Sequence, residues 1–327
     1  MGVVHYGLGP IGLAVAALVA ERPWLRSVAA VDLSPDLVGR RLGEVSGSAI
    51  AGPVIGPSYA GPAEAAVAVH CTGSSLERVA PQIIELASAG LNVISTTEEL
   101  AFPWQAHPGV AAEIDATARG AGITVMGTGI NPGYAMDYLP MTLSAVARRV
   151  DKVVVHRVQD AATRRLPLQR KVGAGLSPDA FRVAAESGRL GHVGLTESAH
   201  ALARALGWQL SDLHETIEPI TAEEATRTAD GVIQPGQVLG LHQTAEGRVD
   251  SQTVISLTLD IAIGVGPSRD RVRLVGEPDL ELEVPGGLHG DTATAAIVVN
   301  AIPRVLAAPP GLAVMAQLPP PTPGPPP

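Results

Sequence analysis

The chain has 327 residues, of which 46% are hydrophobic and 17% charged, so it is long enough for two domains with cores of their own. A formal net charge of −9 and an aromatic content of 3% argue against a nucleic-acid partner, because neither a basic surplus nor base-stacking side chains are present.

The cysteine and histidine content limits the possible chemistry. Cys71 is the single cysteine, which rules out an intramolecular disulfide and a cysteine-based zinc site. The nine histidines show no paired spacing such as HExxH, so no metal is expected. The apolar run at residues 8–20 is too short to span a bilayer and lacks a basic leader, so we expect a cytoplasmic protein without a membrane segment.

Short apolar segments alternate with longer alanine-rich amphipathic segments through the first part of the chain. This alternation is typical of strand–helix–strand units in a parallel sheet. The expected strands are residues 3–6, 28–31, 66–70, 92–95 and 123–127. The expected helices are residues 11–21, 81–89 and 110–121. The fold class is therefore α/β, with an N-terminal Rossmann dinucleotide-binding domain over residues 1–135.

The first expected strand ends in GLGPIG, residues 7–12, where a helix begins. Gly7 permits a tight turn, Gly9 lets the backbone approach a pyrophosphate, and Gly12 lets helix and strand pack closely. The alternative is a helix packed on a strand with nothing bound. The residues expected to contact a dinucleotide here are Gly7, Gly9, Pro10, Ile11 and Gly12.

Asp32 follows the second expected strand, 20 residues after Gly12. A carboxylate at this place binds the adenosine ribose hydroxyls and repels a 2′-phosphate, which favours NAD. Arg40 and Arg41 follow closely enough for one of them to reach a 2′-phosphate, although such a pair is also typical of a solvated helix face. The expected cofactor is NAD or NADP, with NAD favoured.

The segment NVISTTEELAFPW, residues 92–104, lies where ligands bind in parallel sheets, at the carboxyl end of a strand. Thr96 and Thr97 are expected to border the nicotinamide. Glu98 and Glu99 follow, and their apolar neighbours would raise the pKa of an inward-facing carboxylate, which can hold an ammonium or iminium ion or transfer a proton. The alternative is an acidic first turn of a solvated helix.

Two further loops are expected at the same edge of the sheet. The turn after residues 66–70 contributes Thr72 and Gly73 to the cofactor site. The loop GTGINPGY, residues 127–134, carries Asn131, which is placed to hydrogen-bond the nicotinamide carboxamide or the substrate. The alternative for this loop is a plain turn, since Asn, Pro and Gly are residues that turns require.

The pattern changes after residue 135 and predicts an α+β substrate and dimerisation domain with a mixed or antiparallel sheet over residues 136–289. A long apolar helix within residues 290–308 is expected to pack back on the first domain, and the proline-rich residues 318–327 are expected to be disordered. The expected elements are strands at residues 152–158, 254–259, 271–275 and 280–284, and helices at 178–187, 198–206 and 291–307.

Five segments carry a family resemblance: GLGPIG, VDLSPDLVGRRLGEVSG, STTEEL, GTGINPGYAMDYLP and RVQDAATRRLPLQRKVGAGL. In these segments the chain resembles the dihydrodipicolinate-reductase-like group that contains 2,4-diaminopentanoate dehydrogenase and the native amine dehydrogenases. The resemblance extends from about residue 3 to about residue 318 and leaves out only the proline-rich tail.

The resemblance implies NAD(P)-dependent reductive amination, in which a small ketone or aldehyde and ammonia form an imine that accepts a hydride. In such enzymes a glutamate just after the fifth strand handles ammonia, and Glu98 is the favoured match over Glu99. The partners implied by the resemblance are a ketone or amine substrate, ammonia and a second copy of the chain bound through the second-domain sheet. The alternatives are a dehydrogenase of 2,4-diaminopentanoate or a related amino acid, and a dinucleotide-binding sensor without turnover.

Most candidate residues of the substrate pocket are expected in the second domain. By resemblance Arg157 is a pocket residue, and Gln159 lies two positions along the same strand face, opposite to His156. His192 is a candidate to close the pocket, although a loop histidine is more often structural. Thr292 and Thr294, near the start of the last long helix, are candidates to place a hydroxyl near the substrate.

Overall fold

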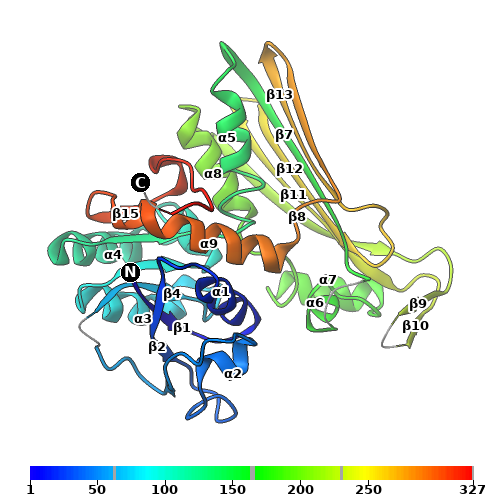
Figure 1. The fold of residues 1–327 in the computed structure, drawn as a ribbon. Coiled ribbons are helices and arrows are strands. Elements are labelled where there is room, and N and C mark those ends of the chain that lie inside the picture. The colour runs from blue at the N-terminus through cyan, green and yellow to red at the C-terminus, as the bar shows by residue number, and fades with distance from the viewer. Residues whose placement is uncertain (62–63, 163–165, 229–230, 326–327) are drawn as a thin grey trace. The chain divides into compact units, whose positions relative to one another are not determined.

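A computed structural model describes residues 1–61, 64–162, 166–228 and 231–325 (Figure 1). The chain divides into two compact units. The first comprises Met1–Tyr134 with His289–Pro327, and the second comprises Ala135–Leu288. Over the described residues, no helix has the length and apolar character needed to cross a membrane.

The first unit contains a parallel sheet of seven strands in the order β15-β6-β5-β4-β1-β2-β3. Its strands are β1 (Gly2–Tyr6), β2 (Arg26–Val31), β3 (Ile55–Gly56), β4 (Ala65–His70), β5 (Asn92–Ser95), β6 (Thr124–Gly127) and β15 (Gly311–Ala313). The five predicted strands are confirmed to within two residues at each end. β3 and β15 are too short to give a sequence pattern. Val3 and Val4 are both inaccessible to solvent, as expected for a sheet covered on both faces.

Helices cover both faces of this sheet because the connections run in opposite directions from β1. α1 (Pro10–Ala20) connects β1 to β2, whereas α3 (Leu76–Ser88) connects β4 to β5 on the other side of β1. Right-handed crossovers then place α1 and α3 on opposite faces. α9 (Gly290–Leu306) packs with α1, and α4 (Pro108–Ala121) packs with α3. Three short elements complete the unit: α2 (Leu42–Ser46), η1 (Glu98–Ala101) and η2 (Met315–Gln317).

The start of α3 differs from the prediction. Proline favours the first turn of a helix, so the sequence predicts a start at Pro81. In the structure α3 begins at Leu76, and Pro81 lies inside the helix. The residue before the helix, Ser75, makes no side-chain cap; instead the carboxylate of Glu99 accepts a hydrogen bond from the Leu76 main-chain nitrogen. A cap supplied from a distant part of the chain leaves no local pattern.

The second unit contains a mixed sheet of six strands in the order β14-β13-β7-β12-β11-β8. The pair β7–β12 is parallel, and the other pairs are antiparallel. The strands are β7 (Arg149–Asp160), β8 (Asp212–Thr221), β11 (Val238–Val249), β12 (Gln252–Ala262), β13 (Arg269–Glu277) and β14 (Leu280–Pro285). A separate antiparallel pair is formed by β9 (Thr226–Thr228) and β10 (Gly231–Ile233). β8 and β11 are not predicted, because charged residues and glycines interrupt their apolar alternation.

Among the described residues the second unit has four helices, and two of them cover one face of its sheet. The four helices are α5 (Tyr138–Ser144), α6 (Leu166–Lys171), α7 (Pro178–Glu186) and α8 (Leu195–Ala205). α5 packs on β7 and β13, while α8 packs on β8, β11 and β12 (Figure 1). The buried side chains Val153, Val155 and Leu257 belong to this covered face. The alternate positions of the same strands carry partly exposed polar side chains.

The C-terminal segment continues past α9 along the first unit. Leu318 is buried, and Arg304 on α9 donates a hydrogen bond from Nε to the carbonyl oxygen of Pro320 at 3.2 Å. Pro326 and Pro327 lie outside the described residues. Disorder of the proline-rich tail stays a prediction.

Candidate active site

The glycine loop has room for a ligand only at its middle glycine. Gly7 has a φ of +88°, and a Cβ atom there would lie 2.6 Å from the carbonyl oxygen of Cys71. A Cβ atom on Gly12 would lie 2.0 Å from the carbonyl oxygen of Gly7. At Gly9, by contrast, a Cβ atom would have no neighbour within 4 Å among the described atoms. Gly7 and Gly12 are therefore needed for packing, and Gly9 faces open space.

The N-terminus of α1 opens at the same place. Gly9 is its N-cap and contributes no side-chain hydrogen bond, and the first turn holds no acidic residue. Pro10 is exposed and Ile11 partly exposed. The main-chain N–H groups and the positive end of the helix dipole are thus available to an anion. These features fit the pyrophosphate of a dinucleotide.

Asp32 is joined to the glycine loop. Its Oδ2 accepts a hydrogen bond from the main-chain nitrogen of Leu8 at 2.6 Å, and its Oδ1 accepts one from that of Ser34 at 2.8 Å. Each carboxylate oxygen retains a second acceptor position, which a ribose hydroxyl can use. Arg40 and Arg41 are exposed, and Arg41 donates to the carbonyl oxygen of Gly52 at 3.1 Å. Arg40 is therefore the arginine of this pair that is kept as a candidate for a 2′-phosphate.

Buried hydroxyl groups connect the end of β5 to the turn after β4. The Ser95 hydroxyl donates to Thr97 Oγ1 at 2.9 Å, and Thr97 Oγ1 donates to the carbonyl oxygen of Gly73 at 2.8 Å. Thr97 is fully buried, so its hydroxyl is used inside the protein. Thr96, which is partly exposed, hydrogen-bonds through its side chain to the Cys71 thiol, and burial raises the pKa of that thiol to about 12.

His70, at the end of β4, supports this connection and has no local sequence signal. Its Nδ1 lies 2.8 Å from Ser95 Oγ. Burial lowers the pKa of His70 to about 4, so the ring is neutral at pH 7, and its Nε2 lies 2.9 Å from the amide oxygen Oε1 of Gln82. The hydroxyl of the exposed Thr72 lies 2.8 Å from that nitrogen.

The two adjacent glutamates have different surroundings. Glu98 is the first residue of η1, directly after Thr97. Glu99 Oε2 accepts a hydrogen bond from the Leu76 main-chain nitrogen at 2.6 Å and lies 3.0 Å from His107 Nε2. The Glu99 carboxylate is thus engaged at the start of α3 and beside the N-cap of α4.

The loop after β6 is held by α9. The main-chain nitrogen of Ile130 donates to Thr294 Oγ1 at 3.3 Å, which fixes the loop next to the buried Asn131. Gly133 has a φ of +117°, and a Cβ atom there would lie 2.5 Å from the Gly129 nitrogen, so the loop is tight. Thr292 is exposed and contacts His289 at its own end of α9. Of the two threonines, Thr294 therefore supports the loop.

In the second unit Arg157 is buried in an ion pair that the sequence does not reveal. Its Nη1 donates to Asp270 Oδ1 at 2.5 Å, and its Nη2 donates to the carbonyl oxygen of Leu288 at 2.6 Å. Asp270 Oδ2 in turn accepts from the Leu288 nitrogen at 2.6 Å. The pair holds the segment that leads toward α9. Gln159, on the same strand face, donates to the neighbouring carbonyl oxygen of Val158 at 3.0 Å.

His192 is held through its main chain by Gln243 on β11. The His192 nitrogen donates to Gln243 Oε1, and Gln243 Nε2 donates to the His192 carbonyl oxygen, both at 2.8 Å. Gln243 also donates to Glu215 Oε1 at 2.8 Å, and burial raises the pKa of Glu215. Among the described residues no group of three His, Cys, Asp or Glu side chains is arranged to hold a metal ion.

Comparisons with known proteins identify the family and the fold of the chain. The family model described as the 2,4-diaminopentanoate dehydrogenase C-terminal domain matches residues 134–323, more than half of the chain. A 2,4-diaminopentanoate dehydrogenase of Acetoanaerobium sticklandii is 32% identical over 265 residues, which cover 77% of this chain and 73% of that protein.

Two solved structures extend the comparison to the whole fold. An amine dehydrogenase from Mycobacterium smegmatis has 25% identity and a TM-score of 0.85, with 98% of this chain and 97% of that chain covered. A scyllo-inositol dehydrogenase from Lactobacillus casei, with bound NAD(H) and scyllo-inositol, has 12% identity and a TM-score of 0.58. It covers 92% of this chain and 88% of its own, and at this identity it shows the fold alone.

Proposed function

The chain belongs to the 2,4-diaminopentanoate dehydrogenase family, and from this premise we propose that it catalyses the reversible reductive amination of a small ketone or aldehyde with ammonia. It is an NAD(P)-dependent oxidoreductase that acts on CH–NH2 groups. The alternative, 2,4-diaminopentanoate or a related amino acid as the substrate, is also consistent with the similarity to the relative from Acetoanaerobium sticklandii.

The residues of the first unit fit a nicotinamide dinucleotide. Gly7, Gly9 and Gly12 with the N-terminus of α1 would hold the pyrophosphate, and Asp32 would accept the hydroxyls of the adenosine ribose. The reduced nicotinamide supplies a hydride when it is bound. The fixed carboxylate of Asp32 supports a preference for NAD, because it would repel a 2′-phosphate.

Glu98 is proposed to bind ammonia and to transfer its protons while the substrate imine forms and is reduced. The observation that supports this assignment is the position of Glu98, which begins η1 at the carboxyl end of β5, directly after the buried Thr97. A negative charge near the carbon–nitrogen bond stabilises the iminium ion as hydride arrives. Asn131, Arg157, Gln159, His192 and Thr292 stay proposed pocket residues.

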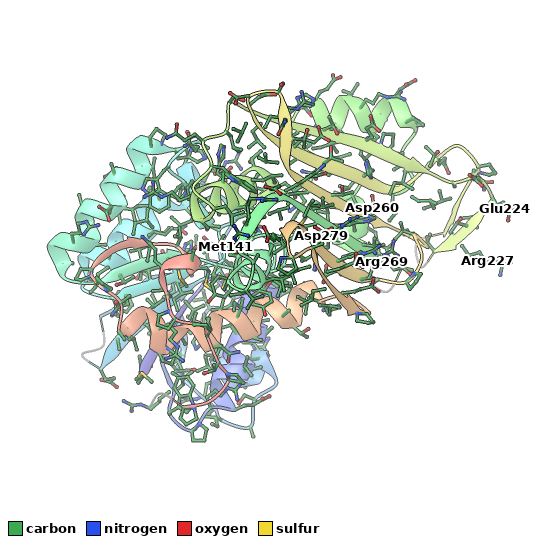
Figure 2. All side chains as sticks on the ribbon, turned by 90° about the horizontal axis from the view of Figure 1, so that it is seen from above. Met141, Glu224, Arg227, Asp260, Arg269 and Asp279 are labelled. Atoms are coloured by element: carbon green, nitrogen blue, oxygen red, sulfur yellow. The ribbon has the colours of Figure 1, made fainter. Side chains whose placement is uncertain are left out.

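A homodimer is proposed to form through the second-domain sheet. Its face opposite to α5 and α8 carries His156, Asp260 and His242, and Asp260 accepts hydrogen bonds from both imidazoles at 2.6 Å. Asp260 is labelled in Figure 2. Burial opposes ionisation of Asp260, but the two hydrogen bonds outweigh it and lower its pKa. A polar face of six strands supports a sheet-to-sheet interface, which light scattering of the purified protein tests. The cytoplasmic location also stays a prediction.

Nicotinamide oxidation with ketone and ammonia supplied together tests the reaction. We expect turnover that needs both compounds, with NADH or NADPH as the reductant. A protein that binds the dinucleotide but gives no rate above background over a broad panel of ketones and aldehydes would be a sensor and not an enzyme.

A further inference from the structure

Glu99 and His107 connect three segments of the first unit that are distant in the sequence. Glu99 lies on η1, Leu76 begins α3, and His107 is the N-cap of α4. A single oxygen atom, Glu99 Oε2, lies 2.6 Å from the Leu76 nitrogen and 3.0 Å from His107 Nε2. The Leu76 residue is fully buried, so its N–H group cannot use bulk water in place of Glu99.

The connected segments are those that carry the candidate site. The turn with Thr72 and Gly73 runs directly into α3, and Glu98 precedes Glu99 in η1. η1 has no side-chain cap of its own: Thr97 precedes it, and the Thr97 hydroxyl is donated to Gly73. Leu100 of η1 packs in the apolar core with residues of α3 and α4, and Glu99 adds a polar connection from η1 to the starts of both helices.

We propose that Glu99 and His107 are positioning residues for the reaction, which hold Glu98 and the 72–75 turn in place through the one oxygen of Glu99. The proposal rests on the proposed function of Glu98. The positioning role of Glu99 requires a hydrogen-bond acceptor oxygen at the position of Oε2, and it does not require a negative charge. A glutamine amide keeps one such oxygen, so both hydrogen bonds survive in Glu99→Gln and neither survives in Glu99→Ala.

Kinetics and hydrogen exchange of Glu99→Ala and Glu99→Gln test the proposal, with Glu113→Gln as a matched control, since Glu113 is an exposed carboxylate on α4. In Glu99→Ala, kcat is expected to fall by about tenfold or more, as for other small misplacements of catalytic groups. The dissociation constant of the cofactor is expected to change by less than about twofold, because the pyrophosphate contacts are elsewhere. Glu99→Gln is expected to keep kcat within about threefold of the parent protein.

Hydrogen exchange measured by mass spectrometry gives a readout that needs no turnover. Peptides over residues 72–79 and 96–101 are expected to exchange faster in Glu99→Ala, and at the parent rate in Glu99→Gln and Glu113→Gln. Unchanged exchange in Glu99→Ala would overturn the proposal, and so would faster exchange with an unchanged kcat. Loss of turnover in Glu99→Gln with parent-like exchange would also overturn it, because the charge would then be the essential feature.

The failure of the proposed function is distinguishable from these outcomes. If the parent protein shows no ammonia-dependent turnover, the function is wrong, and the exchange rates alone decide whether Glu99 secures the two segments. If Glu98→Ala keeps full turnover while Glu99→Ala and Glu99→Gln both lose it, Glu99 is the acid that handles ammonia and its positioning role is refuted.

Discussion

Asp32 Oδ2 lies 2.6 Å from the main-chain nitrogen of Leu8, so the acid after β2 holds the loop between β1 and α1. This one carboxylate thus orders the loop expected to bind the pyrophosphate and stands where the adenosine ribose is expected. The two roles can be separated, because an asparagine side chain retains an acceptor oxygen but not the charge.

Asp32→Asn is expected to shift the cofactor preference toward NADP. Removing the charge removes the repulsion of a 2′-phosphate, and the ratio of kcat/KM for NADPH to that for NADH should rise by about tenfold, the effect of roughly 1.4 kcal/mol. Steady-state rates with both reductants measure the ratio. A ratio equal to that of the parent protein would show that Asp32 does not determine the preference.

Glu98→Gln is expected to lower kcat for ammonia-dependent reduction by about a hundredfold or more, the usual contribution of a positioned acid or base. Binding of the dinucleotide, followed by fluorescence of the reduced nicotinamide, is expected to be unchanged. The exposed Glu113→Gln serves as the control. The assignment of Glu98 fails if this variant retains the turnover of the control.

Arg157→Met is expected to destabilise the second unit by about 3–5 kcal/mol, because Asp270 would be left as a buried charge without its cationic partner. The hydrogen bond from the Leu288 nitrogen to Asp270 would remain. Arg157→Met combined with Asp270→Leu should recover part of that loss, since neither charge is then buried alone. Urea unfolding of the parent protein and of the single and double variants gives the coupling free energy between Arg157 and Asp270. Equal stability of Arg157→Met and the parent protein would mean that the pair is not maintained in solution.

Acid is expected to destabilise the first unit through two buried histidines. Burial lowers the pKa of His5 and of His70 to about 4, whereas both titrate near 6.5 in the unfolded chain. Between these values the unfolded chain binds protons that the folded protein does not. Each histidine therefore lowers the free energy of unfolding by about 1.4 kcal/mol per pH unit as the pH falls from about 6.5 to about 4.

Urea unfolding at pH 7.5, 6 and 5 measures this dependence. His70→Gln removes one of the two histidines, so the slope of the free energy of unfolding against pH should fall by about half. A slope that is the same in His70→Gln and in the parent protein would show that His70 is already charged in the folded protein.

The parallel sheet of the first unit could be predicted because its strands and edges follow local patterns. Five strands, the glycine loop and Asp32 are recognisable within short segments, and so is the acidic pair at the end of β5. The sequence does not reveal that Glu99 is hydrogen-bonded to the start of α3, because Leu76 and Glu99 meet only when α3 and η1 pack together. In the same way Arg157 and Asp270 are far apart in the chain and become neighbours through the β7–β13 register.

Gly9 and Gly12 give opposite predictions on substitution, and this contrast tests whether the loop binds a dinucleotide. A Cβ atom at position 12 would lie 2.0 Å from the Gly7 carbonyl oxygen, so Gly12→Ala must displace backbone and lower the melting temperature. At Gly9 the φ is −63° and the space is open, so Gly9→Ala should fold with a melting temperature within about 2 °C of the parent. For a unit of this size that shift corresponds to less than about 1 kcal/mol.

If the pyrophosphate approaches the Gly9 backbone, however, the alanine methyl group stands in its place. Gly9→Ala should then weaken binding of the reduced dinucleotide by about tenfold or more, measured by fluorescence titration. A stable Gly9→Ala protein with undiminished affinity would mean that the dinucleotide binds elsewhere. In that case no ligand would occupy the open space in front of Gly9. Loss of affinity without loss of stability is the result that only a bound ligand at Gly9 explains.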